Sequence, residues 1–248
     1  MSIWGKIVGG AAGFALGGPI GALLGAVAGH AVDKMATSTP GGPGGAEEQN
    51  GTKQIAFTIG VIVLGAKLAK ADGRVTRDEV SAFREVFQIP PDEVKNVGRL
   101  FDQARKDAHG FEPYAKQIGR MFQHNPTVLE ELIGGLFHIA RADGKVTQDE
   151  IDYLRRVAEI FGFDAANWDR IRAANIGPDE GDPYTILGVT RDDSDVDIKA
   201  AHRKLVVENH PDKLMAEGLP QEFIDLANEK LATINSAYDR IRKERDIA

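Results

Sequence analysis

No formally charged residue occurs between Lys6 and Asp33, and this run is long enough to cross a bilayer as a helix. In water the segment would be a poor helix, because an interior glycine costs about 1 kcal/mol and an interior proline about 3 kcal/mol. In hydrocarbon the backbone must satisfy its own hydrogen bonds, and that requirement enforces a helix. A cleaved signal peptide would have a shorter apolar region, and a flexible linker would be less apolar. We therefore predict a transmembrane helix within residues 1–35.

Six glycines recur at every fourth position of this segment and would line one face of such a helix. They are Gly9, Gly13, Gly17, Gly21, Gly25 and Gly29. Small residues at this spacing let two membrane helices approach closely, so this glycine ladder predicts a homodimer formed within lipid. The alternative is that glycine is simply frequent in membrane helices. Lys6 and Lys34 leave little charge asymmetry, so the orientation of the helix depends on the domains that follow.

Two segments of different composition follow the predicted transmembrane helix. Residues 36–53 are rich in Gly, Pro and polar side chains, which predicts a flexible linker. From residue 54 to residue 175 the apolar side chains recur with helical period, and strand alternation is not convincing. We expect an all-α domain over 54–175.

An internal repeat lies within this helical region. The sequence LAKADGRVTRDEV at 68–80 reappears as IARADGKVTQDEI at 139–151. In each copy a glycine can take the left-handed conformation that closes one helix, and a threonine followed three residues later by glutamate has the spacing of a capping box. These residues are Gly73, Thr76 and Glu79 in the first copy, and Gly144, Thr147 and Glu150 in the second. The repeat therefore predicts two helix–turn–helix units.

Duplicated Ala-Asp-Gly-x-Val-Thr-x-Asp-Glu elements in an all-helical domain resemble the TerB family, named for tellurite resistance. The resemblance implies an acidic cluster that could bind a hard cation such as calcium, whose ligands are oxygens. The matching carboxylates are Asp72, Asp78, Glu79, Asp143, Asp149 and Glu150. These positions lack the alternating acids of an EF-hand, and capping already explains their spacing. We favour the capping interpretation over a metal site.

A third unit occupies residues 182–248. A short helix over Tyr184–Leu187 is expected to stop at Gly188, and Ser194 opens a second helix with an apolar stripe that includes Ile198 and Leu205. Proline at 211 is expected to end that helix, because the residue before a proline is pushed out of helical geometry. A charged loop and a third helix after residue 220 would complete an antiparallel hairpin.

The third unit resembles a J domain: YTILGV is followed by a basic helix that ends in HPDK, and a last helix closes on INSAYDRI. The resemblance implies docking on a DnaK-type chaperone and stimulation of its ATPase. Carried over by position, the trigger residues are His210, Pro211 and Asp212, and the docking residues are Lys199, His202, Arg203 and Lys204. His202 departs from the tyrosine usual at its position. The alternatives are that it weakens docking slightly or makes docking sensitive to pH, and we favour its interpretation as a tolerated aromatic-like residue.

The composition limits the other function classes. The chain of 248 residues has a formal net charge of −7 and no cysteine. The acidic balance argues against nucleic acid as a partner, and the lack of cysteine excludes disulfides and thiolate metal sites. The sequence has no glycine-rich phosphate loop, no pair of histidines four residues apart and no nucleophile elbow. We therefore do not expect an enzyme, and we expect no cofactor.

The order of the three parts resembles that of membrane-anchored DnaJ-like co-chaperones. We expect an all-α protein with a single N-terminal transmembrane helix, a helical TerB-like domain and a C-terminal J-domain hairpin. Because the partner ATPase is cytosolic in such systems, the C-terminal domains are expected in the cytoplasm and the anchor in the bacterial inner membrane. The alternative is a membrane-anchored metal-binding or envelope-stress sensor that acts through the TerB-like domain.

Overall fold

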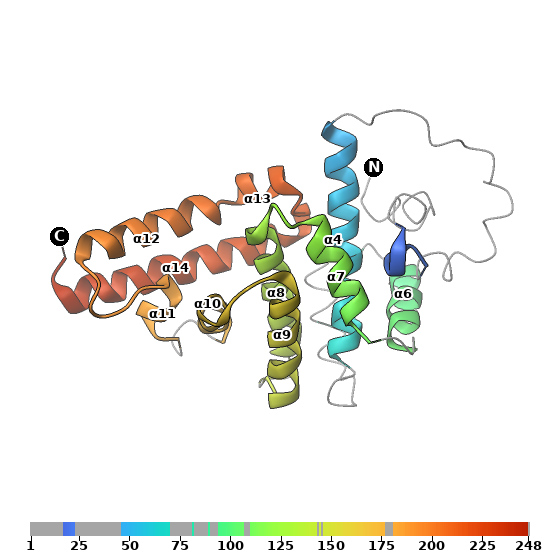
Figure 1. Cartoon of the computed structure of the whole chain (residues 1–248), viewed down its shortest axis with the longest axis horizontal. Helices are drawn as coiled ribbons and strands as arrows, with labels where there is room; N and C mark the ends of the chain where they lie inside the picture. Colours follow the sequence, from blue (N-terminus) through green and yellow to red (C-terminus); the bar gives the residue numbers. More distant parts are fainter. Residues whose placement is uncertain are drawn as a thin grey trace, which may run out of the picture.

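A computed structural model describes most of the chain. The described residues are 17–22, 46–69, 81, 89, 94–106, 110–142, 144, 146–176 and 181–247. Every regular element in these ranges is a helix, which confirms the predicted all-α class for the described part of the chain (Figure 1).

The helices form two groups along the chain. The first group contains α4 (Ala46–Leu68), α6 (Val94–Lys106), α7 (Glu112–Met121), α8 (Pro126–Ala140), α9 (Gln148–Phe161) and α10 (Ala165–Asn175). The second group contains α11 (Pro183–Leu187), α12 (Asp195–Glu208), α13 (Pro211–Glu217), the 3-10 turn η2 (Gln221–Phe223) and α14 (Ile224–Arg245). Figure 1 shows α12 and α14 running side by side at one end of the molecule, as the predicted hairpin requires.

Helix α4 forms the centre of the first group. All of its residues from 55 to 68 are buried, and it packs against α6, α7, α8 and α9. The hydroxyl of Tyr153 in α9 donates a hydrogen bond of 2.9 Å to the carbonyl of Leu64, which joins α9 to α4. The helix begins at Ala46. Residues 46–53, expected in a flexible linker, are therefore the first two turns of α4.

The second copy of the internal repeat folds as its sequence predicts. Gly144 has a φ of 104°, in the left-handed region that a side chain would disfavour. The hydroxyl of Thr147 accepts the backbone N–H of Glu150, and a carboxylate oxygen of Glu150 accepts the N–H of Thr147 at 2.7 Å. The capping box that opens α9 is confirmed. The first copy, including Gly73, Thr76 and Glu79, lies outside the described residues.

The N-terminal segment is described only over residues 17–22. A helix was predicted through Gly17, but the helix here begins at Gly18, and both glycines have positive φ, 53° and 59°. The side-chain amide of Gln117 in α7 donates to the carbonyl of Gly17 and accepts the N–H of Ile20, each at 3.0 Å. No helix among the described residues has both the length and the apolar character needed to cross a membrane. Gly9, Gly13, Gly25 and Gly29 lie outside the described residues.

The connection between α12 and α14 differs from the charged loop that the sequence predicted. Helix α12 ends at Glu208, and a short helix, α13, begins at Pro211. Proline is favourable at the first position of a helix, where its missing N–H has no intrahelical partner. The proline thus ends one helix by starting another. The beginning of α12 is as predicted, because the hydroxyl of Ser194 accepts the N–H of Asp197.

Candidate functional site

The tripeptide His210-Pro211-Asp212 forms the corner between α12 and α13. His210 is the N-cap of α13, and its Nδ1 accepts the backbone N–H of Asp212 at 3.3 Å. The side chains of His210 and Asp212 are 54% and 90% exposed. Proline fixes the backbone angle between them. The corner therefore presents an imidazole Nε2 and an acceptor-only carboxylate to solvent in a restrained geometry.

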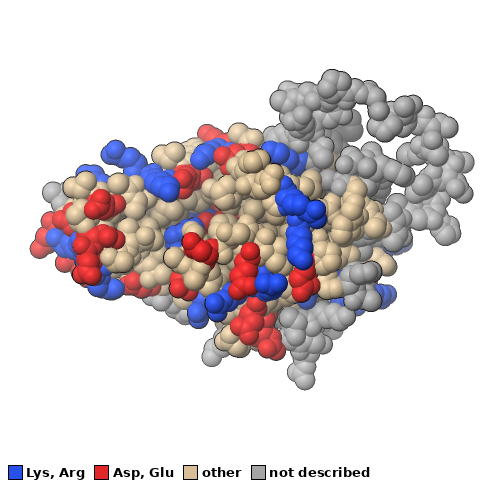
Figure 2. Space-filling view, in the orientation of Figure 1, with Lys and Arg blue, Asp and Glu red and all other residues tan. Residues whose placement is uncertain are grey.

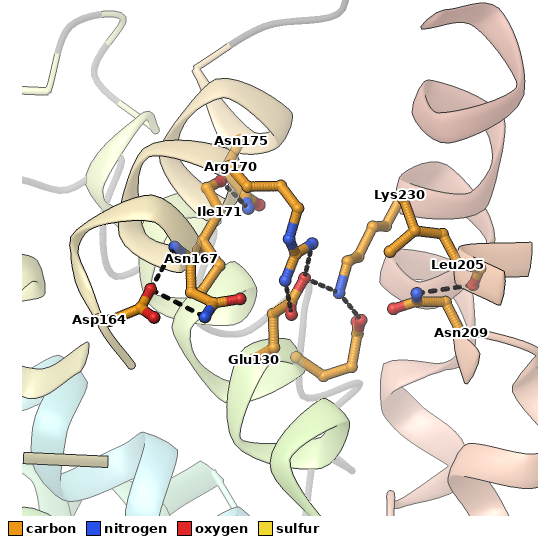
Figure 3. Close-up of polar contacts among 10 residues, drawn as sticks. Glu130, Asp164, Asn167, Arg170, Ile171, Asn175, Leu205, Asn209 and Lys230 are labelled. Carbon is orange, nitrogen blue, oxygen red and sulfur yellow. Dashed lines mark hydrogen bonds and ion pairs between the residues drawn. The ribbon is translucent and has the colours of Figure 1, made fainter. Parts of the chain in front are cut away.

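Buried residues lie on both sides of this exposed tripeptide. Asn209 is 1% exposed, and its side-chain amide donates a hydrogen bond of 2.8 Å to the carbonyl of Leu205 in α12 (Figure 3). Leu214, two residues beyond Asp212, is fully buried. The backbone N–H of Leu214 donates to the carbonyl of His210 at 3.1 Å, which closes the first turn of α13. The tripeptide is therefore exposed, whereas residues on both sides of it, Asn209 and Leu214, are buried.

The predicted docking cations lie on α12, before the tripeptide. Lys199, Arg203 and Lys204 are all exposed. Residues four apart on a helix share a face, so Lys199 and Arg203 form a row that leads toward the corner. Figure 2 shows basic side chains gathered over the part of the surface that α12 occupies. The structure brings these three cations together as a positive surface that an acidic partner could approach.

His202, which was predicted with them, has different surroundings. Its ring stacks on that of Tyr238 in α14, with centroids 4.1 Å apart and planes 5° from parallel. Its Nε2 lies 2.9 Å from Oδ1 of Asn235 in α14, within hydrogen-bond distance. The aromatic-like interpretation agrees with this packing between the two hairpin helices.

The hairpin has its own apolar cluster, which holds α11 against α12 and α14. Its buried members are Ala173, Tyr184, Ile186, Leu187, Ile198, Leu205, Ile234, Ala237 and Ile241. Arg245 at the end of α14 closes the cluster, because its guanidinium donates to the Tyr184 hydroxyl and to the carbonyls of Arg191 and Asp193. The sequence interpretation did not assign a role to Arg245.

Residues beyond the tripeptide pack instead into the core of the first helical group. Leu214, Leu219, Phe223 and Ala227 all belong to the apolar cluster around α4. The ring of Phe223 meets that of Phe57 edge to face, with centroids 4.7 Å apart. We call Leu214, Leu219 and Phe223 the apolar plug. Sequence reasoning missed this plug, although LMAEGLPQEF after HPDK carries more apolar residues than a solvated loop requires.

A buried ionic cluster joins the same two parts of the molecule. Nζ of Lys230 in α14 lies 2.7 Å from Glu130 and 2.6 Å from Glu131, both in α8. Arg170 in α10 makes a two-pronged hydrogen-bonded pair with Glu130 (Figure 3). Helices α8, α10 and α14 therefore meet at a cluster of two acidic and two basic side chains. Two adjacent acids within an otherwise apolar helix, VLEELIGGLF, are the sequence signal that could have revealed it.

The two carboxylates of the ionic cluster are affected in opposite directions. Burial raises the pKa of Glu130, but the charges of Lys230 and Arg170 outweigh burial and lower this pKa from 4.5 to about 2. For Glu131 burial is the larger effect, and the single neighbouring ammonium of Lys230 offsets only part of it, so the pKa lies above 4.5. Removing one member of such a cluster would leave an uncompensated buried charge.

Of the six acidic residues considered for metal binding, the structure describes two, Asp149 and Glu150. Glu150 is buried and occupied by the capping box, whereas Asp149 is exposed. Asp72, Asp78, Glu79 and Asp143 lie outside the described residues. Within the part of the chain that the structure describes, no group of three or more acids or histidines is placed to hold a metal ion.

Comparisons with known proteins agree with this arrangement. Residues 182–247 match the DnaJ domain, residues 58–173 match the tellurite resistance protein TerB, and residues 1–56 match the transmembrane domain of co-chaperone DjlA. The exposed tripeptide on its helical hairpin thus belongs to a J-domain protein, and the N-terminal match supports membrane association. No solved structure is significantly similar to the chain.

Full-length relatives then give the family. The chain is 31% identical to the co-chaperone protein DjlA of Photobacterium profundum, over 98% of this chain and 99% of the relative. It is 31% identical to that of Aliivibrio fischeri and 29% identical to that of Coxiella burnetii, in both cases over the full length of both chains. The chain belongs to the DjlA family of co-chaperones.

Proposed function

We propose that this chain is a membrane-tethered co-chaperone that docks on a DnaK-type chaperone and stimulates its ATPase. The observation that carries the proposal is the exposed His210-Pro211-Asp212 corner at the end of a basic helix. The imidazole and the carboxylate of the corner trigger hydrolysis on the partner, so this chain contributes no catalytic group of its own. The proposal assigns the chain a regulatory role rather than an enzymatic one.

The exposed cations of α12 supply the docking energy in this proposal. Lys199, Arg203 and Lys204 meet an acidic surface of the ATPase, and such complementary charge accelerates association and selects the partner. Since exposed charges are screened by salt, the binding should weaken as ionic strength rises. Docking of α12 then brings the His210-Pro211-Asp212 corner to its binding site on the ATPase.

In this proposal the N-terminal segment anchors the activity at a membrane. The match of residues 1–56 to a DjlA transmembrane domain supports an anchor in the bacterial inner membrane, with the C-terminal domains in the cytoplasm where the ATPase resides. We further propose that the glycine ladder pairs two anchors into a homodimer, because small residues every four positions favour close helix contact in lipid.

Docking is tested by reversing one charge on α12. Arg203→Glu in the full-length protein should weaken binding to the ATP-bound chaperone and reduce the salt dependence of that binding. Arg172→Glu is the matched control, because Arg172 is also an exposed helical arginine but lies in α10. Equal binding by the two variants would remove α12 as the docking surface.

A further inference from the structure

The position of the apolar plug has a consequence for the trigger. A helical hairpin should bury the apolar residues of its loop against its own helices. Here the apolar cluster of the hairpin contains none of Leu214, Leu219 and Phe223. All three are fully buried in the cluster around α4. The segment directly after the trigger is therefore folded by the TerB-like domain.

The contacts of the plug leave little free space on the TerB-like side. A Cβ placed on Gly135 of α8 would lie 3.1 Å from the Phe223 ring, so Phe223 sits directly against the α8 backbone. Gly218 has a φ of 112°, and a Cβ there would lie 3.0 Å from Cβ of Lys53 in α4. A side-chain nitrogen of Gln54 also lies 3.5 Å from the carbonyl of Leu219. The segment 214–223 is seated between α4 and α8.

The buried ionic cluster fixes the other side of the same junction. Lys230 is 7% exposed and reaches both Glu130 and Glu131 from α14, two turns after Phe223. Figure 3 shows Asn209, the C-cap of α12, bonded to Leu205 of the same helix. Asn209 directly precedes His210, and its Oδ1 is buried without a hydrogen-bond partner among the described residues.

The short helix that begins within the tripeptide depends on this seating. Isolated helices shorter than about 12 residues are marginal in water, and α13 has only seven. Without the buried contact of Leu214, the first turn of α13 would open. The His210–Asp212 hydrogen bond and the orientation of both exposed groups would be lost with it. A trigger already held in its binding geometry avoids an ordering cost when it docks.

The geometry points to the TerB-like domain as the element that positions the trigger, with the apolar plug Leu214, Leu219 and Phe223 as its positioning residues. This inference rests on the proposed function and adds to it an assignment for the TerB-like domain. The docked arrangement is the active one. Releasing the plug lowers the fraction of molecules whose trigger can bind, and the apparent affinity for the chaperone falls by that fraction.

Release of the apolar plug is tested with Gly135→Leu in the full-length protein. The new side chain would push against Phe223 while keeping α8 helical. The half-saturating concentration for ATPase stimulation should rise about tenfold with little change in the maximal rate, because binding rather than triggering is affected. Hydrogen exchange at the Leu214 amide should accelerate in the free protein. Gly98→Leu in α6 is the control, because Gly98 is also a helical glycine and a Cβ there would meet no atom within 4 Å.

A second variant locks the plug in place. The chain has no cysteine, so Lys53→Cys with Gly218→Cys introduces the sole pair of thiols. Their Cβ atoms would start 3.0 Å apart and must move outward to reach the roughly 3.5–4.5 Å separation of a disulfide. The oxidised protein should stimulate the ATPase at least as well as the same protein after reduction. Any strain that the new side chain causes at Gly218 is present in both the oxidised and the reduced protein.

Two results would overturn the inference. One is an unchanged half-saturating concentration in Gly135→Leu when the Leu214 amide exchanges faster. The other is a loss of stimulation on oxidation, which would mean that the docked plug inhibits the trigger. Failure of the proposed function is a separate result: the wild-type protein would then give no stimulation, while the exchange measurement would still report on the plug.

Discussion

Phe57 in α4 and Phe223 at the start of α14 meet edge to face, with ring centroids 4.7 Å apart and planes at 81°. One ring belongs to the central helix of the TerB-like domain, and the other lies directly after the trigger segment of the J domain. Both side chains are fully buried. The two domains of the described structure therefore share one apolar core, and loss of either ring should affect both.

Phe223→Ala tests this shared core. Truncation of a buried phenylalanine leaves a cavity and costs about 3–5 kcal/mol of the free energy of unfolding. We also expect the unfolding of the two domains to separate, because the plug couples them. Urea titration followed by far-ultraviolet circular dichroism would measure both effects. Val207→Ala is the control, since Val207 is 59% exposed on α12 and should change stability by less than about 0.5 kcal/mol.

The ionic cluster gives stability a pH dependence of predictable sign. The pKa of Glu130 is about 2 in the folded protein, below the ordinary 4.5, so the unfolded chain binds more protons between these values. The stability that Glu130 contributes is present above pH 4.5 and is lost as the pH falls toward 2. Glu130→Gln should remove that part of the acid sensitivity, as measured by urea titrations from pH 5 to pH 2.

Glu131 should act in the opposite direction. Its pKa is raised in the folded protein, so the folded state binds more protons above pH 4.5, and its contribution falls as the pH rises through the raised pKa. Glu131→Gln should therefore flatten the stability curve above pH 4.5 and leave the acid limb intact. If the two glutamine variants changed the same limb, the charge assignments within the cluster would be wrong.

The capping box at Thr147 provides a test of the acidic repeat. Thr147→Ala should lower the free energy of unfolding by about 0.5–2 kcal/mol, the usual cost of a lost N-cap, whereas Thr147→Ser keeps the hydroxyl and most of the stability. Calcium or magnesium at about 1 mM, the range of weak extracellular sites, should not shift the melting temperature. A calcium-dependent shift that disappears in Asp143→Asn would favour a metal site over caps.

The glycine ladder makes a prediction about assembly in the membrane. Gly21→Ile with Gly25→Ile should reduce energy transfer between labelled anchors in vesicles, because two branched side chains would separate the helices. Gly10→Ile lies off the ladder and should have little effect. Membrane fractionation would confirm that every variant still inserts. Equal pairing by ladder and off-ladder variants would mean that the glycines reflect composition alone.

Sequence reasoning was strongest where a function or a cap is encoded within a few residues. The Thr147–Glu150 box, the left-handed Gly144 and the Ser194 cap are local, and each could be predicted from spacing, whereas the role of the corner at His210 was implied by the resemblance to a J domain. The shared core could not, because Phe223 meets Phe57 only after the whole helical domain has folded. Lys230 finds Glu130 and Glu131 across about a hundred residues of chain for the same reason. Helix α13 was missed because tertiary burial of Leu214 overrides the weak propensity of a seven-residue segment.

We expect the exposed corner at His210 to trigger hydrolysis on a partner ATPase, which single-turnover hydrolysis by a DnaK-type chaperone would measure. The full-length protein in detergent should accelerate hydrolysis, and His210→Gln should abolish the acceleration without changing the circular dichroism spectrum, because His210 is largely exposed. His124→Gln, an exposed histidine between α7 and α8, should behave as wild type. Full stimulation by the His210→Gln protein would show that the His210 corner is not the trigger.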